Sequence, residues 1–201
     1  MARMRLALSA AIAGAAVLAS APAQAQLSAT AEQAVPVTGN APQVCTLQPG
    51  RIETGGLVNF LGIDGDTLQI DELTDKRTLA ARAASATISF AAVCNFPHRV
   101  RIESQNNGLW PTDGRMSTTA QGFAYALPYR ARMDWGSVSG DFLADAQVRR
   151  LTEDRVSVDL PTAGDLRLRI EIEPGASNVG ANAPVLAGVY GDTVRIFLEP
   201  R

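Results

Sequence analysis

The sequence is poor in the residues on which catalytic and nucleic-acid-binding sites most often depend. Its 201 residues include one lysine, Lys76, and one histidine, His98. The formal net charge is −2, and arginine is not clustered into a basic stripe. Binding to a nucleic acid relies on clustered lysine and arginine that release counterions from the phosphates. We therefore expect no nucleic-acid partner.

The scarcity of histidine also limits catalysis. A Ser-His-Asp or Cys-His site would have to use His98, which follows a proline in a turn, and no Gly-x-Ser-x-Gly motif accompanies it. We expect His98 on the surface. Phosphate-binding glycine motifs are absent, and the acids at Asp64 and Asp66 lack the later ligands of a calcium loop. The sequence predicts no enzyme, cofactor or metal site, although two carboxylates that meet only in space stay open as an alternative.

Long apolar runs are missing except at the N-terminus. Arg3 and Arg5 precede an apolar run over 6–18, and Ala23-Gln24-Ala25 follows it. This order is typical of a secretory signal peptide that is cleaved off, here over 1–25. A retained anchor helix is the alternative. Cleavage would remove both arginines and take the formal net charge from −2 to −4.

Cysteine is scarce as well, with Cys45 and Cys94 alone. In an exported chain, two cysteines most simply form one disulfide. Two free buried thiols are the alternative.

Alternation of apolar and polar residues is abundant and indicates the fold class. It predicts strands over 86–94, 99–104, 156–160 and 166–172, and a longer one over 123–135 that Pro128 interrupts. An alanine-rich stretch over 79–84 fits a helical turn. Seven or eight strands bounded by turn residues predict an all-β chain, an antiparallel β-sandwich.

The last stretch of the sequence also alternates. Val194, Ile196 and Leu198 share one face, and Arg195, Phe197 and Glu199 share the other. This pattern predicts a half-buried strand. We expect its free edge to need a partner, because an unpaired apolar edge is a template for pairing with another chain.

A segment over 26–43 offers a candidate partner. It is small, polar and proline-containing, which is typical of a flexible linker. It also carries a weak strand pattern, in which the apolar positions are Leu27, Ala29, Ala31, Val35 and Val37. Linker and strand stay open as interpretations.

Four motifs of this chain resemble a known family. A cysteine follows the tail in Val44-Cys45-Thr46-Leu47, and the second cysteine lies in Val93-Cys94-Asn95, ahead of a strand that runs to Asn107-Gly108. An aromatic strand over 123–129 precedes Trp135-Gly136. The fourth motif is Pro184-Val-Leu-Ala-Gly-Val-Tyr-Gly-Asp-Thr-Val194. Together they resemble the spore coat protein U domain, the pilin-like module of archaic, Csu-type chaperone–usher pili, although Leu-Ala-Gly stands where that family has Pro-Ala-Gly.

The resemblance implies an immunoglobulin-like sandwich over 44–201 that lacks its last strand. A periplasmic chaperone would lend a strand, and an outer-membrane usher would then replace it with the tail of a neighbouring pilin subunit. The tail residues Leu27 to Val37 would be the donor strand, and Val194, Ile196 and Leu198 would line the acceptor groove. The implied product is an extracellular pilus on the cell surface that supports adhesion or biofilm formation. The alternative is a self-complemented secreted or periplasmic binding module.

Overall fold

The computed structural model describes residues 33–112 and 120–201. By its contacts the chain divides into two units, Met1–Asn40 and Ala41–Arg201. In the first unit, the described residues 33–40 have no regular secondary structure. The described residues of the second unit form thirteen strands, and the described part of the chain has no helix. The prediction of an all-β chain is therefore confirmed.

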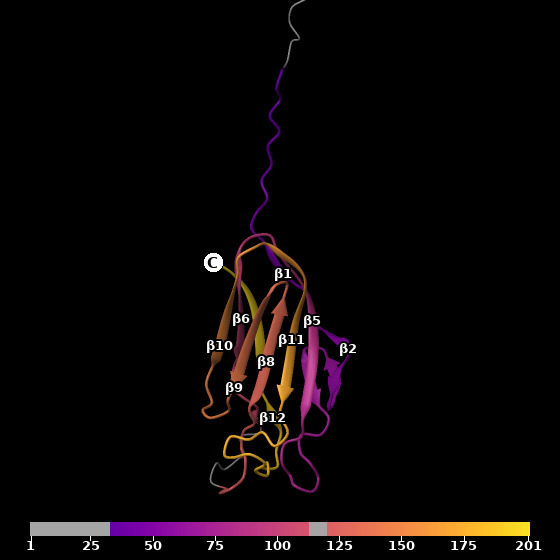
Figure 1. The fold of residues 1–201 in the computed structure, drawn as a ribbon, viewed down its shortest axis with the longest axis vertical. Helices are drawn as coiled ribbons and strands as arrows, with labels where there is room; N and C mark the ends of the chain where they lie inside the picture. The colour runs from indigo at the N-terminus through magenta and orange to yellow at the C-terminus, as the bar shows by residue number, and fades with distance from the viewer. Residues whose placement is uncertain (1–32, 113–119) are drawn as a thin grey trace, which may run out of the picture. The chain divides into compact units, whose positions relative to one another are not determined.

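A six-stranded antiparallel sheet forms one layer of the second unit. Figure 1 shows β5 (Ala84–Cys94), β11 (Thr162–Ile172), β8 (Tyr129–Trp135) and β9 (Val138–Ala144) side by side in this order. Two further strands share the outer edge of β5, namely β1 (Cys45–Leu47) and β2 (Arg51–Val58). β5 and β11 are the longest strands, and they pair along their full length of eleven residues.

A three-stranded antiparallel sheet forms the other layer. β6 (His98–Ser104) lies in its centre, with β10 (Thr152–Val158) on one side and β13 (Val194–Pro200) on the other. Two small sheets complete the unit. One pairs β12 (Tyr190–Gly191) with β7 (Trp110–Pro111), and the other is the hairpin of β3 (Phe60–Asp64) and β4 (Thr67–Ile70).

The core lies between the two layers, as the alternation predicted. Alternate residues of β5, β6 and β11 face inward, and their burial is nearly complete at Ala86, Ile102 and Leu166. One cluster joins the apolar faces of both sheets. The half-buried residues Val194 and Ile196 of β13 pack against this cluster.

His98 corrects one expectation. It was predicted on the surface, yet its side chain is fully buried at the start of β6. Its Nδ1 lies 2.8 Å from the carbonyl oxygen of Phe96, and its ring centroid lies 4.9 Å from that of Trp135. The turn before it folds back over the end of the sandwich, so that the imidazole becomes part of the core.

Three other elements differ from the pattern or refine it. Pro128 breaks the long aromatic strand, and only Tyr129–Trp135 forms β8. The predicted helical turn over 79–84 is wrong, because these residues are irregular and lead into β5 at Ala84. β9 was not predicted, since Gly140 occupies one of its inward positions and weakens the alternation.

Candidate functional site

The free edge of β13 is the first part of the candidate site. Within the described residues, β13 pairs with β6 and with no other strand. The backbone N–H of Gln105 donates to the carbonyl of Thr193 at 3.0 Å, so that Thr193 and Gln105 form a hydrogen-bonded pair at the start of this ladder. Hydrogen-bonded pairs alternate along an antiparallel ladder. The main-chain groups of residues 194, 196 and 198 therefore point away from β6, toward the unpaired edge.

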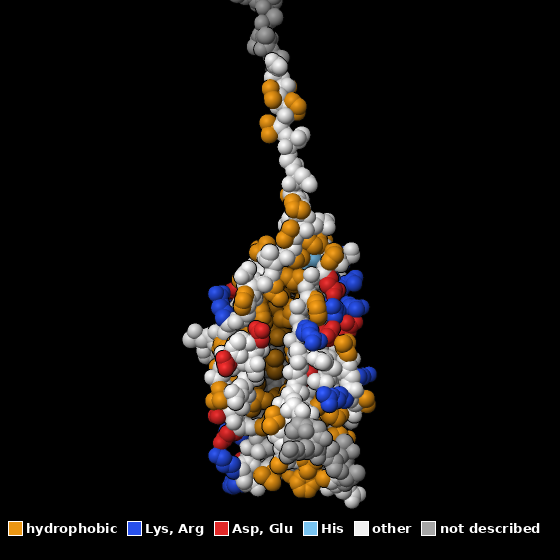
Figure 2. Space-filling view, turned by 180° about the vertical axis from the view of Figure 1, so that it is seen from behind, with side chains coloured by type: hydrophobic (Ala, Val, Ile, Leu, Met, Phe, Trp, Pro, Cys, Tyr) orange, Lys and Arg blue, Asp and Glu red, His pale blue; other side chains and the backbone are white. Residues whose placement is uncertain are grey.

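An apolar groove of about 450 Å³ lies beside this edge. Figure 2 shows it as a long hollow with a hydrophobic floor, on the face opposite to the view of Figure 1. The floor is the inner face of the six-stranded sheet, and β13 contributes one wall. Its apolar lining from these strands comprises Leu47, Ile88, Phe90, Leu168, Ile170, Ile172, Val194 and Ile196.

The predicted groove residues are thus brought together in part. Val194 and Ile196 line the groove, whereas Leu198 packs against the core beyond it. All three side chains are half-buried. A β-strand with free main-chain groups beside such a floor can accept a further strand, which would bury its alternate side chains in the groove.

The connection between β1 and β2 borders the same groove. A Cβ atom on Gly50 would lie 2.6 Å from Cε1 of Phe90 and 2.7 Å from Cγ2 of Ile88. Only glycine lets the backbone pass this closely over the groove floor. Gly50 therefore keeps the large floor side chains in place at this edge of the sheet.

The predicted donor residues fall in the other unit. Leu27, Ala29 and Ala31 lie outside the described residues. Val35 and Val37 are described, and their side chains are 75% and 93% exposed. The other residues over 33–43 are exposed as well and have no regular secondary structure, so this segment fits a linker as well as a strand without its partner.

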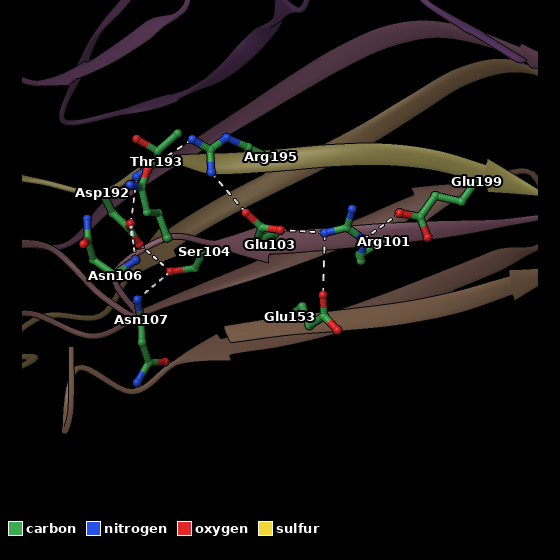
Figure 3. A network of polar contacts seen from close by, with 11 residues as sticks. Arg101, Glu103, Ser104, Asn106, Asn107, Glu153, Asp192, Thr193, Arg195 and Glu199 are labelled. Carbon is green, nitrogen blue, oxygen red and sulfur yellow. Dashed lines mark hydrogen bonds and ion pairs between the residues drawn. The ribbon is translucent and has the colours of Figure 1, made fainter. Parts of the chain in front are cut away.

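A half-buried carboxylate stands at one end of the groove. Asp192 lines it and immediately precedes β13. Its Oδ2 accepts hydrogen bonds from Ser104 Oγ at 2.5 Å and from Tyr129 Oη at 2.7 Å. Three backbone N–H groups also donate to the carboxylate, those of Asn106, Gly108 and Thr193. Figure 3 shows Ser104, Asn106 and Thr193 converging on Asp192.

This cluster ties β13 to β6 and to β8 at the point where β13 begins. Burial is the main cause that raises the pKa of Tyr129, and the negative charge of Asp192 adds to it. The phenol therefore stays protonated and donates. Because every oxygen of Asp192 is occupied, the cluster is a structural anchor for the groove wall rather than a free acid.

A charged network holds the outer face of β13. Arg101 of β6 bonds Glu199 through Nε at 2.7 Å and Glu103 through Nη1 at 2.5 Å, and it lies 3.6 Å from Glu153 of β10. Arg195 of β13 reaches the other oxygen of Glu103 at 3.1 Å. The hydrogen bond to Glu199 is the largest cause that raises the pKa of Arg101. The network, drawn in Figure 3, links three strands. It therefore favours the register of β13, whose opposite edge pairs with no strand of the described residues.

The cysteines form the predicted disulfide. Cys45 and Cys94 are directly opposed in the pairing of β1 with β5, and their Cα atoms are 4.2 Å apart. Next to them, Asn95 Oδ1 accepts from the N–H of Val44, and its Nδ2 donates to the carbonyl of Pro42. These bonds fix the first residues of the second unit against β5.

Sequence reasoning missed two parts of this site. Asp192 carried no prediction of its own, because nothing in the local sequence indicates that five donors converge on it. The β3–β4 hairpin was also missed. Asp64 and Asp66 lie at its turn, but the strands on either side are short and a bulge at Leu61 interrupts their alternation.

In residues 33–112 and 120–201, no three His, Cys, Asp or Glu side chains group so as to hold a metal ion. No helix of this described part is long and apolar enough to cross a membrane. No family model, curated protein or solved structure matches the chain.

Proposed function

We propose that this chain is a structural subunit of a chaperone–usher surface pilus and that it polymerises by donor-strand exchange. One observation carries the proposal. The edge of β13 that pairs with no described strand presents the main-chain groups of Val194, Ile196 and Leu198 beside an apolar groove. Such an edge supplies hydrogen bonds to an added strand, and pockets along the groove select its alternate side chains.

The tail of a neighbouring copy is the proposed occupant. Its apolar positions from Leu27 to Val37 have the period of two that an inserted strand needs. When the tail of one copy enters the groove of the next, the contact is heterologous and propagates into a filament. A periplasmic chaperone would fill the groove before assembly, and an outer-membrane usher would exchange it for the tail. The fibre would serve adhesion or biofilm formation.

A self-complemented immunoglobulin-like binding module is the alternative function. The same tail belongs to the same chain, so it also has the pattern needed to fold back into its own groove. The two functions differ in which molecule supplies the strand. In one case the product is a polymer, and in the other it is a stable monomer.

Two complementary variants distinguish these functions. The tail variant combines Leu27→Asp with Val35→Asp, and the groove variant carries Ile196→Asp. Each should fail to polymerise when it is expressed alone with its chaperone, because a carboxylate in an apolar groove costs several kcal/mol. When the two are coexpressed, the intact tail of the groove variant should enter the intact groove of the tail variant. The expected product is a one-to-one dimer in size-exclusion chromatography.

Thr38→Asp and Ser157→Glu are the matched controls. Thr38 lies on the polar side of the tail pattern, and Ser157 is exposed on β10, away from the groove. Both variants should polymerise like the unmodified chain. Polymers from the tail variant alone, or monomers from the unmodified chain expressed without any chaperone, would contradict the proposal.

A further inference from the structure

The β3–β4 hairpin stands apart from both layers of the sandwich. Its strands are hydrogen-bonded to each other and, within the described residues, to no other strand. β3 lies beside β2 and β5. β4 therefore carries the edge of the hairpin that is farther from the six-stranded sheet.

The apolar side of the hairpin forms the second wall of the groove. Phe60 and Ile63 from β3, and Leu68 and Ile70 from β4, line the groove that β13 lines from the other side. Phe60 and Ile70 lie at the base and pack against the buried core, whereas Ile63 and Leu68, near the turn, do not. The outer half of the hairpin thus offers a pair of apolar side chains to the groove alone.

A polar clip fixes the base of the hairpin. Asn59, with φ of 57°, donates from Nδ2 to the carbonyl of Glu72 at 2.7 Å and accepts from the N–H of Glu72 at 3.0 Å. Its carbonyl also accepts from the N–H of Asp71. Beyond this clip the pairing shifts at a bulge between Phe60 and Gly62, and bulges bend and twist a hairpin. The base is held while the outer half is restrained only by its own ladder.

We propose that the hairpin is a second docking edge for the strand that enters the groove. The entering strand would pair with β13 along one of its edges and with β4 along the other. Filling the groove would then join the hairpin to β13, β6 and β10 in one continuous sheet. This inference rests on the proposed function, in that the entering strand is the tail of a second copy. Two flanking strands bonded to one inserted strand lie roughly 9–10 Å apart.

Hydrogen exchange of the full chain tests this pairing. The tail variant, Leu27→Asp with Val35→Asp, serves as the receptor, and a synthetic peptide of residues 26–38 serves as the probe. On peptide binding, the exchange rates of the β13 amides and of the β4 amides should both fall by at least about tenfold. A free strand edge opens locally, whereas a paired edge does not. β9 is the internal control: it also has an unpaired edge among the described strands but lies away from the groove, and its exchange should not change.

A matched pair of substitutions tests the wall itself. Leu68 is half-buried in the groove, whereas Gln69 is exposed on the same strand. In the receptor, Leu68→Asp should weaken peptide binding about 10- to 100-fold, as expected when one buried leucine contact is lost, and Gln69→Asp should leave it within about twofold. Circular dichroism checks that both variants are folded.

The outcomes separate the inference from the function on which it rests. If the peptide binds and protects β13 but leaves β4 unchanged, the hairpin is not a docking edge and the proposed function stands. If the peptide does not bind the receptor, both are overturned. Protection of β4 together with β13 supports both.

Discussion

Removing the charge of Asp192 is expected to destabilise the start of β13 more than any single hydrogen bond would suggest. The carboxylate accepts from two hydroxyls and three backbone N–H groups. In Asp192→Asn, the amide oxygen can keep the donors that face Oδ1, those of Asn106 and Thr193. The amide nitrogen then replaces Oδ2. The hydroxyls of Ser104 and Tyr129 can rotate to accept from it, but the N–H of Gly108 cannot.

The magnitude follows from this difference. Hydrogen bonds to a charged group contribute about 1.5–3 kcal/mol each, neutral ones about 0.5–1.5 kcal/mol, and an orphaned donor costs about 1–3 kcal/mol. Because Asp192 is partly exposed, we expect Asp192→Asn to lower the free energy of unfolding by about 2–4 kcal/mol. Tyr129→Phe removes one donor and orphans no group, since four donors remain, so we expect a loss of about 1–2 kcal/mol.

Urea unfolding of the tail variant background, followed by circular dichroism, measures both losses. With a slope of about 2 kcal/mol per molar urea, Asp192→Asn should lower the midpoint by about 1–2 M. Tyr125→Phe is the matched control, because the Tyr125 hydroxyl makes no hydrogen bond to a described residue. The double variant should lose less than the sum of the single losses, since both act on one network. The reasoning is refuted if Asp192→Asn stays within about 0.5 kcal/mol of the parent chain.

Three further outcomes can be measured on the same background. Because the pKa of Tyr129 is raised in the folded chain, this phenol ionises at a lower pH in the unfolded chain, and the free energy of unfolding should fall as the pH rises above about 10. In urea unfolding, Tyr129→Phe should make this alkaline loss of stability less steep. The Cys45–Cys94 disulfide joins residues 49 positions apart, and its reduction removes this constraint from the unfolded chain. In the chain-entropy model the free energy of unfolding should fall by about 4 kcal/mol, which dithiothreitol would reveal as a lower urea midpoint. An unchanged midpoint would contradict this expectation. Gly108→Ala should cost about 1–3 kcal/mol more than Gly62→Ala by thermal unfolding, because both glycines have φ near +135° but only Gly108 would place a Cβ 2.6 Å from Ala146; equal losses would exclude the steric cause.

Local patterns predicted those parts of the fold in which a strand is long and regular. The alternation over 86–94, 99–104 and 166–172 predicted β5, β6 and β11, and it assigned their inward faces. It failed at β9, where a glycine takes an inward position, and at the β3–β4 hairpin, where a bulge shifts the register. Periodicity is read over several residues, so one glycine or one extra residue is enough to hide a short strand.

The candidate site could be predicted only along β13. Its alternation identified Val194, Ile196 and Leu198 as one face, but not which edge of the strand would stay unpaired. The groove floor was predicted as core, because a residue such as Phe90 or Leu168 has the same pattern whether a second layer covers it or not. His98 shows the same limit from the other side, since a polar turn residue is buried when the turn folds over the end of the sandwich.

The sequence by itself determined the all-β class and the faces of the long strands, because both depend on residue type and on spacing along the chain. Only the tertiary structure decided that β13 pairs with a single one of the described strands, that five donors meet at Asp192, and that the hairpin faces β13 across a groove. These features depend on segments that are far apart in the chain. Which of them become neighbours is set by how the two sheets bury their apolar faces together, and no local pattern encodes it.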